Sequence, residues 1–157
     1  MTLFEMVTAY FDANNWPYER VAGHPDVIRT VYEGRNGHFV CFCQAREDFQ
    51  QVLFYSIWDE PCPEARRPVM AEFVTRANYG MLIGNFELDY KDGEVRYKAS
   101  LDVESAQLTQ ALIHNLVVAS VMTMDRYLPG VIGVARSALD PISAILQVEA
   151  SMGGAEA

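Results

Sequence analysis

Two cysteines separated by a single residue are the first candidates for chemistry in this sequence. Because side chains alternate along a β-strand, Cys41 and Cys43 would share one face, where two thiols can bind one metal ion or each other. A closed zinc site needs four ligands at tetrahedral spacing, and Cys62, His24 and His38 do not form a second ligand pair. We therefore predict that both thiols are small core residues and that the chain holds no metal; a redox pair is the alternative.

A general base or a nucleophile is the next candidate. His114 stands beside Asn115 in an uncharged segment and could act as a base, although a histidine on an apolar helix is more commonly a core or interface residue. No serine lies in a nucleophile elbow, and no cysteine is flanked by an activating histidine. The sequence thus predicts no catalytic residue and no cofactor.

Carboxylates gather near the ends of one segment, where paired acids could do acid–base work. They are Glu87, Asp89, Asp102 and Glu104. Such work needs one carboxyl in an apolar pocket and another in water. All four alternate with apolar residues and are expected to point to solvent, where Arg96 and Lys98 can face them across strands. We predict a solvated lattice of ion pairs.

The segment that carries these charges, Asn78 to Asp102, is expected to be a β-hairpin around the turn Asp92-Gly93. Its apolar positions recur at every second residue: Leu82, Gly84, Phe86, Leu88 and Tyr90 before the turn, and Val95, Tyr97, Ala99 and Leu101 after it. A period of two specifies one buried face and one wet, charged face.

Capping signals and helical spacing place the helices. Thr2 and Glu5 have the form of a capping box, which predicts a first helix from Leu3 to Ala13. A second helix is expected after Pro63, with Val69, Phe73 and Ala77 as its buried stripe, and a third from Ser105 to about Tyr127. After an interruption at Pro129-Gly130, we expect a short helix over Val131–Ala138 and a last one from Asp140-Pro141 to about Val148. The third is apolar nearly all round, so it should be buried on more than one side.

Four strands are expected between the first two helices, at Tyr18–Val21, Val27–Tyr32, His38–Ala45 and Val52–Trp58. The last two are apolar on both faces, so both faces should be covered by something. We expect one surplus set to meet a dimer mate or to form a groove for a protein segment: Val40, Phe42, Leu53, Tyr55 and Ile57. Alternation alone does not decide which set faces the helices, because a one-residue register shift exchanges the two faces.

Composition bounds the class of protein. The 157 residues suit one domain over residues 1–150, with a frayed tail over 151–157. A net charge of −9, with 12 Lys and Arg among 21 Asp and Glu, argues against nucleic-acid binding. The uncharged run from Ser105 to Met124 contains Gln107, Gln110, His114 and Asn115, so we interpret it as a buried helix and expect no membrane partner. An odd number of cysteines and the absence of a signal-peptide pattern favour the cytoplasm.

A family resemblance rests on several short segments. They are Arg76-Ala77-Asn78-Tyr79, Gly84-Asn85-Phe86-Glu87-Leu88-Asp89, Asp92-Gly93-Glu94-Val95-Arg96-Tyr97, Asp125-Arg126-Tyr127-Leu128-Pro129 and Asp140-Pro141-Ile142-Ser143-Ala144-Ile145. From roughly Leu3 to Val148 the chain resembles the YbjN-domain proteins, described as sensory-transduction regulators. The resemblance implies an α+β fold, an antiparallel β-sheet with helices packed mainly on one face, like that of type III secretion chaperones, which dimerise and hold an extended segment of a partner.

These observations favour a non-enzymatic protein-interaction domain, a homodimeric chaperone-like adaptor or regulator with a protein or peptide partner. The alternative is a small enzyme or ligand-binding domain with an unrecognised pocket, for which Cys41, Cys43 and His114 are the residues to test first. A subunit of a larger assembly is a third interpretation. Fold analogy does not decide among them.

Overall fold

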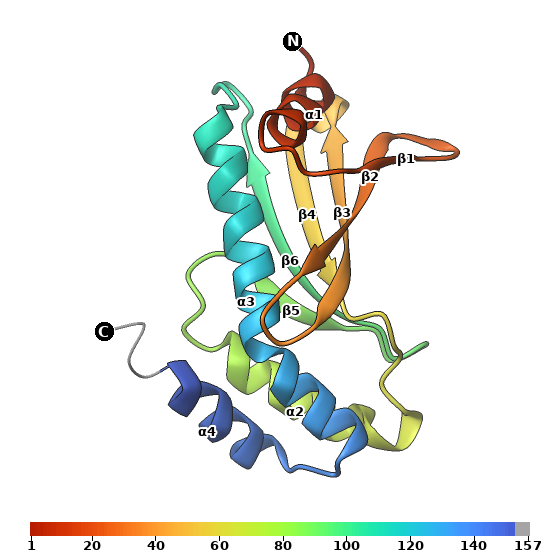
Figure 1. Ribbon diagram of the computed structural model, residues 1–157, viewed down its shortest axis with the longest axis vertical. Helices are drawn as coiled ribbons and strands as arrows, with labels where there is room; N and C mark the ends of the chain where they lie inside the picture. The colour runs from red at the N-terminus through yellow and green to blue at the C-terminus, as the bar shows by residue number, and fades with distance from the viewer. Residues whose placement is uncertain (153–157) are drawn as a thin grey trace.

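A six-stranded antiparallel sheet forms the centre of the computed structural model, which describes residues 1–152 (Figure 1). The strands are β1 (Glu19–Val21), β2 (His24–Glu33), β3 (His38–Arg46), β4 (Gln51–Ile57), β5 (Asn85–Leu88) and β6 (Val95–Asp102), in the order β1-β2-β3-β4-β6-β5. The four strands expected between the first two helices are therefore all present. β3 and β4, which are apolar on both faces, lie in the middle of the sheet, where each strand is paired on both sides.

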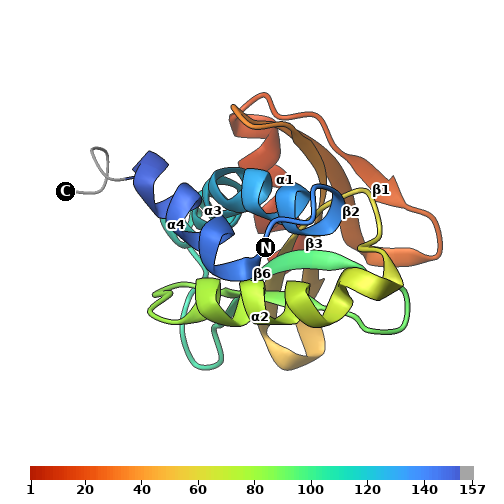
Figure 2. The ribbon, with the colours of Figure 1, turned by 90° about the horizontal axis from the view of Figure 1, so that it is seen from below.

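The helices lie mainly on one face of this sheet, as the α+β expectation required. They are α1 (Leu3–Ala13), α2 (Arg67–Asn78), α3 (Gln110–Arg136) and α4 (Pro141–Met152), with short 3-10 turns at Glu47–Phe49 and Glu64–Arg66. α3 crosses the sheet and contacts β4 and β6, α1 covers the end of β3, and α4 packs against both α2 and α3 (Figures 1 and 2). α4 continues to Met152, and the rest of the expected tail, residues 153–157, lies outside the described residues.

The first helix begins as predicted. The Thr2 hydroxyl accepts a hydrogen bond from the Glu5 backbone N–H at 3.1 Å, and the Thr2 N–H donates to the Glu5 carboxylate at 2.8 Å. This reciprocal pair satisfies two N–H groups that a helix start otherwise leaves unpaired. Val7, Tyr10 and Phe11 then point into the core.

The first strand of the expected hairpin is shorter than the sequence pattern predicts. β5 begins at Asn85, and Leu82 is 97% exposed although its position in the alternation suggested burial. Gly84 adopts a positive φ of 76°, and a Cβ there would meet the Lys98 carbonyl oxygen at 2.5 Å. The extended conformation therefore stops at Gly84, and residues 79–84 form a loop. Tyr90, at the other end of the pattern, is 56% exposed.

The third helix differs from the prediction at both ends. Thr109, and not Ser105, caps it, because the Thr109 hydroxyl accepts from the Leu112 N–H at 3.2 Å while Ser105 lies in a turn with a φ of 60°. The helix also runs unbroken through Pro129 to Arg136, where we expected an interruption. One continuous helix of 27 residues therefore replaces two shorter ones.

A contact from the β2–β3 turn explains how α3 tolerates Pro129. Proline has no N–H, so it cannot bond the carbonyl oxygen four residues earlier, that of Asp125. The Asn36 side-chain amide donates to this carbonyl at 2.9 Å instead. The Asp125 carboxylate in turn accepts the backbone N–H groups of Arg35 at 3.0 Å and Asn36 at 2.9 Å. Gly34 completes the contact, since a Cβ there would collide with the Asp125 carboxylate.

α3 is also long and apolar enough to cross a membrane by length and composition, and it is the one such helix in residues 1–152. In the structure its buried side, which includes Ile113, Leu116 and Met124, packs on the sheet. This placement agrees with its interpretation as a core helix.

The contact between Asn36 and the Pro129 turn predicts a non-additive pair of substitutions. Asn36→Ala should lower the free energy of unfolding by about 1–2 kcal/mol, because it leaves the Asp125 carbonyl unpaired. In a Pro129→Ala background the loss should shrink by about 1 kcal/mol, because the new N–H of residue 129 can bond that carbonyl. Urea unfolding of the four proteins measures this coupling, and strictly additive losses would contradict the explanation.

Candidate functional site

The structure decides which face of the middle strands the helices cover. Phe39, Cys41, Cys43 and Ala45 of β3 and Val52, Phe54 and Ser56 of β4 are all at most 2% exposed. Their neighbours on the other face are partly exposed. This second face, which we call the open sheet face, consists of Val27, Arg29 and Val31 of β2, Val40, Phe42 and Gln44 of β3, and Leu53, Tyr55 and Ile57 of β4.

All five residues predicted to bind a partner lie together on the open sheet face. Val40 pairs with Ile57 and Phe42 with Tyr55 across the β3–β4 ladder, and Leu53 pairs with Gln44 one row further along. Directly opposite side chains on one face of an antiparallel pair are close enough to touch. The five side chains therefore form one contiguous apolar surface, extended by Val27 and Val31 on β2.

The open sheet face is hollowed in two places. One hollow, of about 420 Å³, lies over Val27, Phe42 and Tyr55, and a second, of about 520 Å³, lies over Val40, Phe42 and Ile57. Because both are lined by Phe42 and Ile57, they form one shallow groove across the strands.

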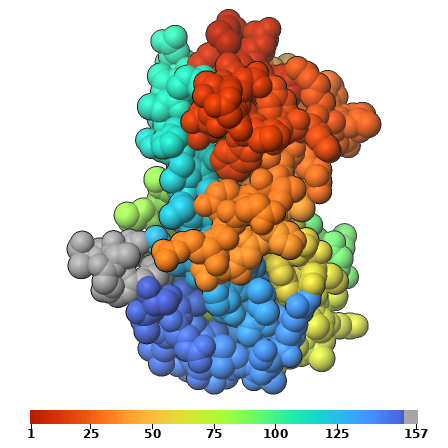
Figure 3. All heavy atoms as spheres, in the orientation of Figure 1, coloured from red at the N-terminus to blue at the C-terminus, as the bar shows by residue number. Residues whose placement is uncertain are grey.

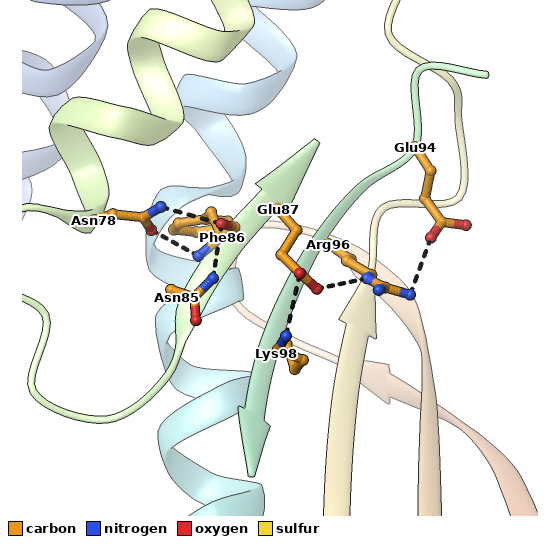
Figure 4. Close-up of polar contacts among 7 residues, drawn as sticks. All are labelled: Asn78, Asn85, Phe86, Glu87, Glu94, Arg96 and Lys98. Carbon is orange, nitrogen blue, oxygen red and sulfur yellow. Dashed lines mark hydrogen bonds and ion pairs between the residues drawn. The ribbon is translucent and has the colours of Figure 1, made fainter. Parts of the chain in front are cut away.

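Charged side chains border the apolar centre on the β6 side (Figure 4). The Glu87 carboxylate accepts from Arg96 at 2.9 Å and from Lys98 at 3.2 Å, and Arg96 also lies 3.7 Å from Glu94. The Arg96 guanidinium sits 4.5 Å from the centre of the Tyr55 ring, a cation–π contact. The predicted ion-pair lattice is thus present around Glu87. Asp89 and Asp102 instead accept from the Lys91 N–H and from Gln51 with the Glu104 N–H, and the sequence did not predict that Glu94 pairs with Arg96 or that Arg96 covers Tyr55.

One end of the open sheet face is acidic. Glu33 follows Val31 on β2 and pairs with His38, whose ring nitrogen lies 3.4 Å from the Asp59 carboxylate. Glu94 adds a further carboxylate on the same border, beside the second hollow. At the opposite end of the sheet, the Gln51 side chain and the Glu104 backbone N–H hold the pKa of the Asp102 carboxyl below its ordinary value. Asp102 is therefore ionised and unsuited to donate a proton.

The outer edge of the sheet at β5 is closed by a side chain. The Asn78 carbonyl oxygen accepts from the Phe86 backbone N–H at 2.6 Å, and the Asn78 amide donates to the Phe86 carbonyl at 3.1 Å (Figure 4). The side-chain amide thus takes the place of a neighbouring strand. An incoming strand would have to displace it to pair with β5.

The residues considered for catalysis or metal binding are not brought together. Cys41 and Cys43 lie on the helix-covered face, and burial raises the pKa of each thiol to about 12. His114 is exposed on α3, and its Nδ1 lies 3.1 Å from the Tyr10 hydroxyl, so it pairs with α1 and is not a core residue. Within residues 1–152, no group of three His, Cys, Asp or Glu side chains could hold a metal ion.

Comparison with known protein families identifies the family of this chain. A family model for YbjN, described as "Putative bacterial sensory transduction regulator", matches residues 4–132. The chain belongs to the YbjN family. The match spans α1, the whole sheet, α2 and most of α3, so the open sheet face and the Asn78 contact both lie inside the YbjN domain.

Solved structures agree on the fold. YbjN from E. coli superposes with a TM-score of 0.60 at 17% identity, covering 77% of this chain and 84% of that chain. The HopA1–SchA chaperone–effector complex gives a TM-score of 0.51 at 14% identity, covering 76% of this chain and 88% of that chain. The architecture is therefore of the type III secretion chaperone kind, as the resemblance implied. No curated protein sequence matches this YbjN-family chain.

The buried thiols generate a stability prediction. Replacing Cys41 and Cys43 together by alanine should lower the free energy of unfolding by about 1–3 kcal/mol, because it removes packed atoms from the core. The pKa of each thiol is about 9 in the unfolded chain and about 12 in the folded chain, where burial disfavours the thiolate. The neutral thiols therefore contribute fully to the free energy of unfolding below pH 9, and this contribution is lost as the pH rises from 9 to 12.

The difference in unfolding free energy between the parent and the double alanine variant should accordingly narrow between pH 9 and pH 12. Tyrosine and lysine titrate in both proteins, so the comparison isolates the thiols. Rapid reaction of Cys41 or Cys43 with a disulfide reagent in the native protein at neutral pH, or stoichiometric zinc in protein purified without added metal, would count against a structural role.

The closed sheet edge generates a second prediction. Asn78→Asp keeps an acceptor for the Phe86 N–H but removes the donor to the Phe86 carbonyl, whereas Asn78→Ala removes both. We expect Asn78→Ala to cost about 1–3 kcal/mol and to speed hydrogen exchange at the Phe86 amide, while Asn78→Asp keeps that amide protected. The Tyr97 amide, inside the sheet, is the internal control. Unchanged exchange at Phe86 in Asn78→Ala would show that the edge is not held by this contact.

Proposed function

We propose that residues 1–150 of this chain form one non-enzymatic protein-interaction domain of the cytoplasm. In this proposal the domain is a homodimeric, chaperone-like adaptor or regulator, and its open sheet face binds a segment of a partner protein. Val40, Phe42, Leu53, Tyr55 and Ile57 form the binding surface.

The observation that carries the proposal is the contiguous apolar surface at the centre of the sheet. Large apolar side chains that cover neighbouring strands without a second layer above them are typical of interaction surfaces. Burying them releases about 25 cal/mol per Å² of apolar area, and the partly exposed rings of Phe42 and Tyr55 at the centre are suited to act as anchors. The fold is shared with a protein of the HopA1–SchA chaperone–effector complex, which supports a partner-binding role at the level of architecture.

The borders of the surface indicate how a partner would bind. Arg29 on one side and Arg96 and Lys98 on the other flank the apolar centre, while Asp59 and Glu94 mark an acidic end. Such borders favour one orientation of a bound segment through charge complementarity. Because Asn78 closes β5, we infer that the segment lies on the face of the sheet and does not extend it at that edge.

A small-molecule site, with or without catalysis, is the second candidate, and the two hollows favour it. Their volumes of about 420 and 520 Å³ fall within the range of small-ligand pockets. Neither hollow is lined by a thiol, and His24 is the one histidine among their lining residues. A shallow groove without a paired base and nucleophile fits a bound protein segment better than a reaction.

Charge placed on the open sheet face should weaken partner binding. Phe42→Asp and Tyr55→Asp should each weaken capture of the partner at least tenfold, because a carboxylate at an apolar anchor must be desolvated on binding. The matched control is Leu146→Asp on α4, where the side chain is 62% exposed on the helix side. Capture from the native cell extract, followed by peptide identification and a binding titration of the identified partner, measures the effect.

The same experiment tests the location of the site. Thermal unfolding and sedimentation must first show that Phe42→Asp and Tyr55→Asp remain folded with the parent's mass. If these variants then bind the same partner as tightly as the parent and the Leu146→Asp control do, the partner surface lies elsewhere and the proposal fails.

A further inference from the structure

A stripe without charge runs along the outward side of α3. It consists of Leu112, Asn115, Ala119 and Met122, which recur at spacings of three and four residues and therefore share one face of the helix. Leu112 is 36% exposed and Met122 is 44% exposed. Sheet contacts bury the other side of α3, whereas the stripe stays partly exposed, with the Tyr32 hydroxyl of β2 donating to the Met122 Sδ at 3.7 Å at its end.

The 79–84 loop lies beside this stripe and carries the two most exposed large apolar side chains of the described residues, Leu82 and Tyr79. Leu82 is 97% exposed, Tyr79 is 93% exposed and Ile83 is 50% exposed. Tyr97 of β6 anchors the loop, because its hydroxyl donates to the Ile83 carbonyl. Figures 1 and 3 show the loop next to the middle of α3.

We propose that the stripe and the loop together, here called the α3–loop surface, form the contact between two copies of this chain. The inference rests on the homodimer of the proposed function and assigns it a surface. In a two-fold dimer the same patch meets itself, so it must be self-complementary in charge as well as shape.

The charge distribution argues for a second copy as the occupant. The chain carries a net charge of −9, so two copies repel unless they meet where charges are absent. Residues 77–86 and 105–124 contain no Asp, Glu, Lys or Arg, and these two runs supply the loop and the stripe. A basic partner would gain nothing from such a surface, whereas a second copy avoids like-charge contact on it.

The geometry of the stripe also suits helix pairing. Ala119 lies at its centre, and its small side chain lets two α3 helices approach closely, with Leu112 and Met122 of one copy packing beside those of the other. The arrangement leaves the open sheet face of each copy free, because α3 packs on the opposite face of the sheet.

Sedimentation equilibrium of the full chain at micromolar concentration tests the inference. The parent should have twice the 17.7 kDa mass of one chain. Met122→Glu and Leu82→Glu should each raise the dimer dissociation constant at least about a hundredfold, because each places two carboxylates in a buried contact. Both positions are exposed in one chain, so unfolding temperatures measured at dilutions where all proteins are monomeric should match the parent's.

Two further variants separate the outcomes. Tyr90→Glu, at an equally bulky and 56% exposed position in the β5–β6 turn, should keep the dimer mass. Tyr55→Asp should also keep the dimer mass, because Tyr55 lies on the open sheet face, which does not contact the second copy in this proposal. A parent that sediments as one chain overturns both the homodimer and this surface. A dimer that persists in Met122→Glu and Leu82→Glu, or that dissociates in Tyr55→Asp, leaves the homodimer standing and overturns the α3–loop surface.

Discussion

The position of α3 across one face of the sheet is the constraint on which the rest of the structure depends. The β2–β3 turn fixes it, since Asn36 replaces the hydrogen bond that Pro129 cannot make and Asp125 binds the turn's N–H groups. α3 and its neighbouring helices can bury only the Phe39 and Phe54 side of β3 and β4. The other side of these strands is equally apolar and has no such layer, so the fold itself leaves a surface whose burial by a partner is favourable.

The surroundings of that surface limit what can occupy it. Arg96 stacks on Tyr55 while its ion pairs with Glu87 and Glu94 hold it in place, which makes the β6 border polar and ordered. Asn78 closes the β5 edge, so main-chain pairing there competes with an existing pair of hydrogen bonds. Exposed apolar side chains on the helix side, gathered on α3 and the 79–84 loop, provide a second and separate surface. The two exposed apolar surfaces therefore lie on opposite sides of one sheet.

The sequence predicted most of the fold, and its errors have physical causes. α1 was predicted to the residue because its capping box and helical spacing are local signals. The interruption expected at Pro129 was wrong because the donor that satisfies the Asp125 carbonyl, Asn36, lies 89 residues from Asp125 in the chain. Gly80 and Gly84 ended the first hairpin strand early through positive φ angles that the alternation of Leu82 and Tyr90 does not reveal. The apolar set of the open sheet face was found from alternation, but its exposure depended on where α3 packs, which alternation does not encode.

The central claim is that the open sheet face, and not the helix side, meets a partner protein. A photo-reactive benzoylphenylalanine placed at Tyr55 and, in a separate protein, at Leu82 tests it in the native cell, because the probe forms a covalent bond only with what lies against it. We predict that the Tyr55 position yields an adduct with a different protein and that the Leu82 position yields an adduct between two copies of the 17.7 kDa chain. An adduct from Tyr55 that contains only a second copy, or no protein adduct from Tyr55 while Leu82 captures a different protein, would contradict the account.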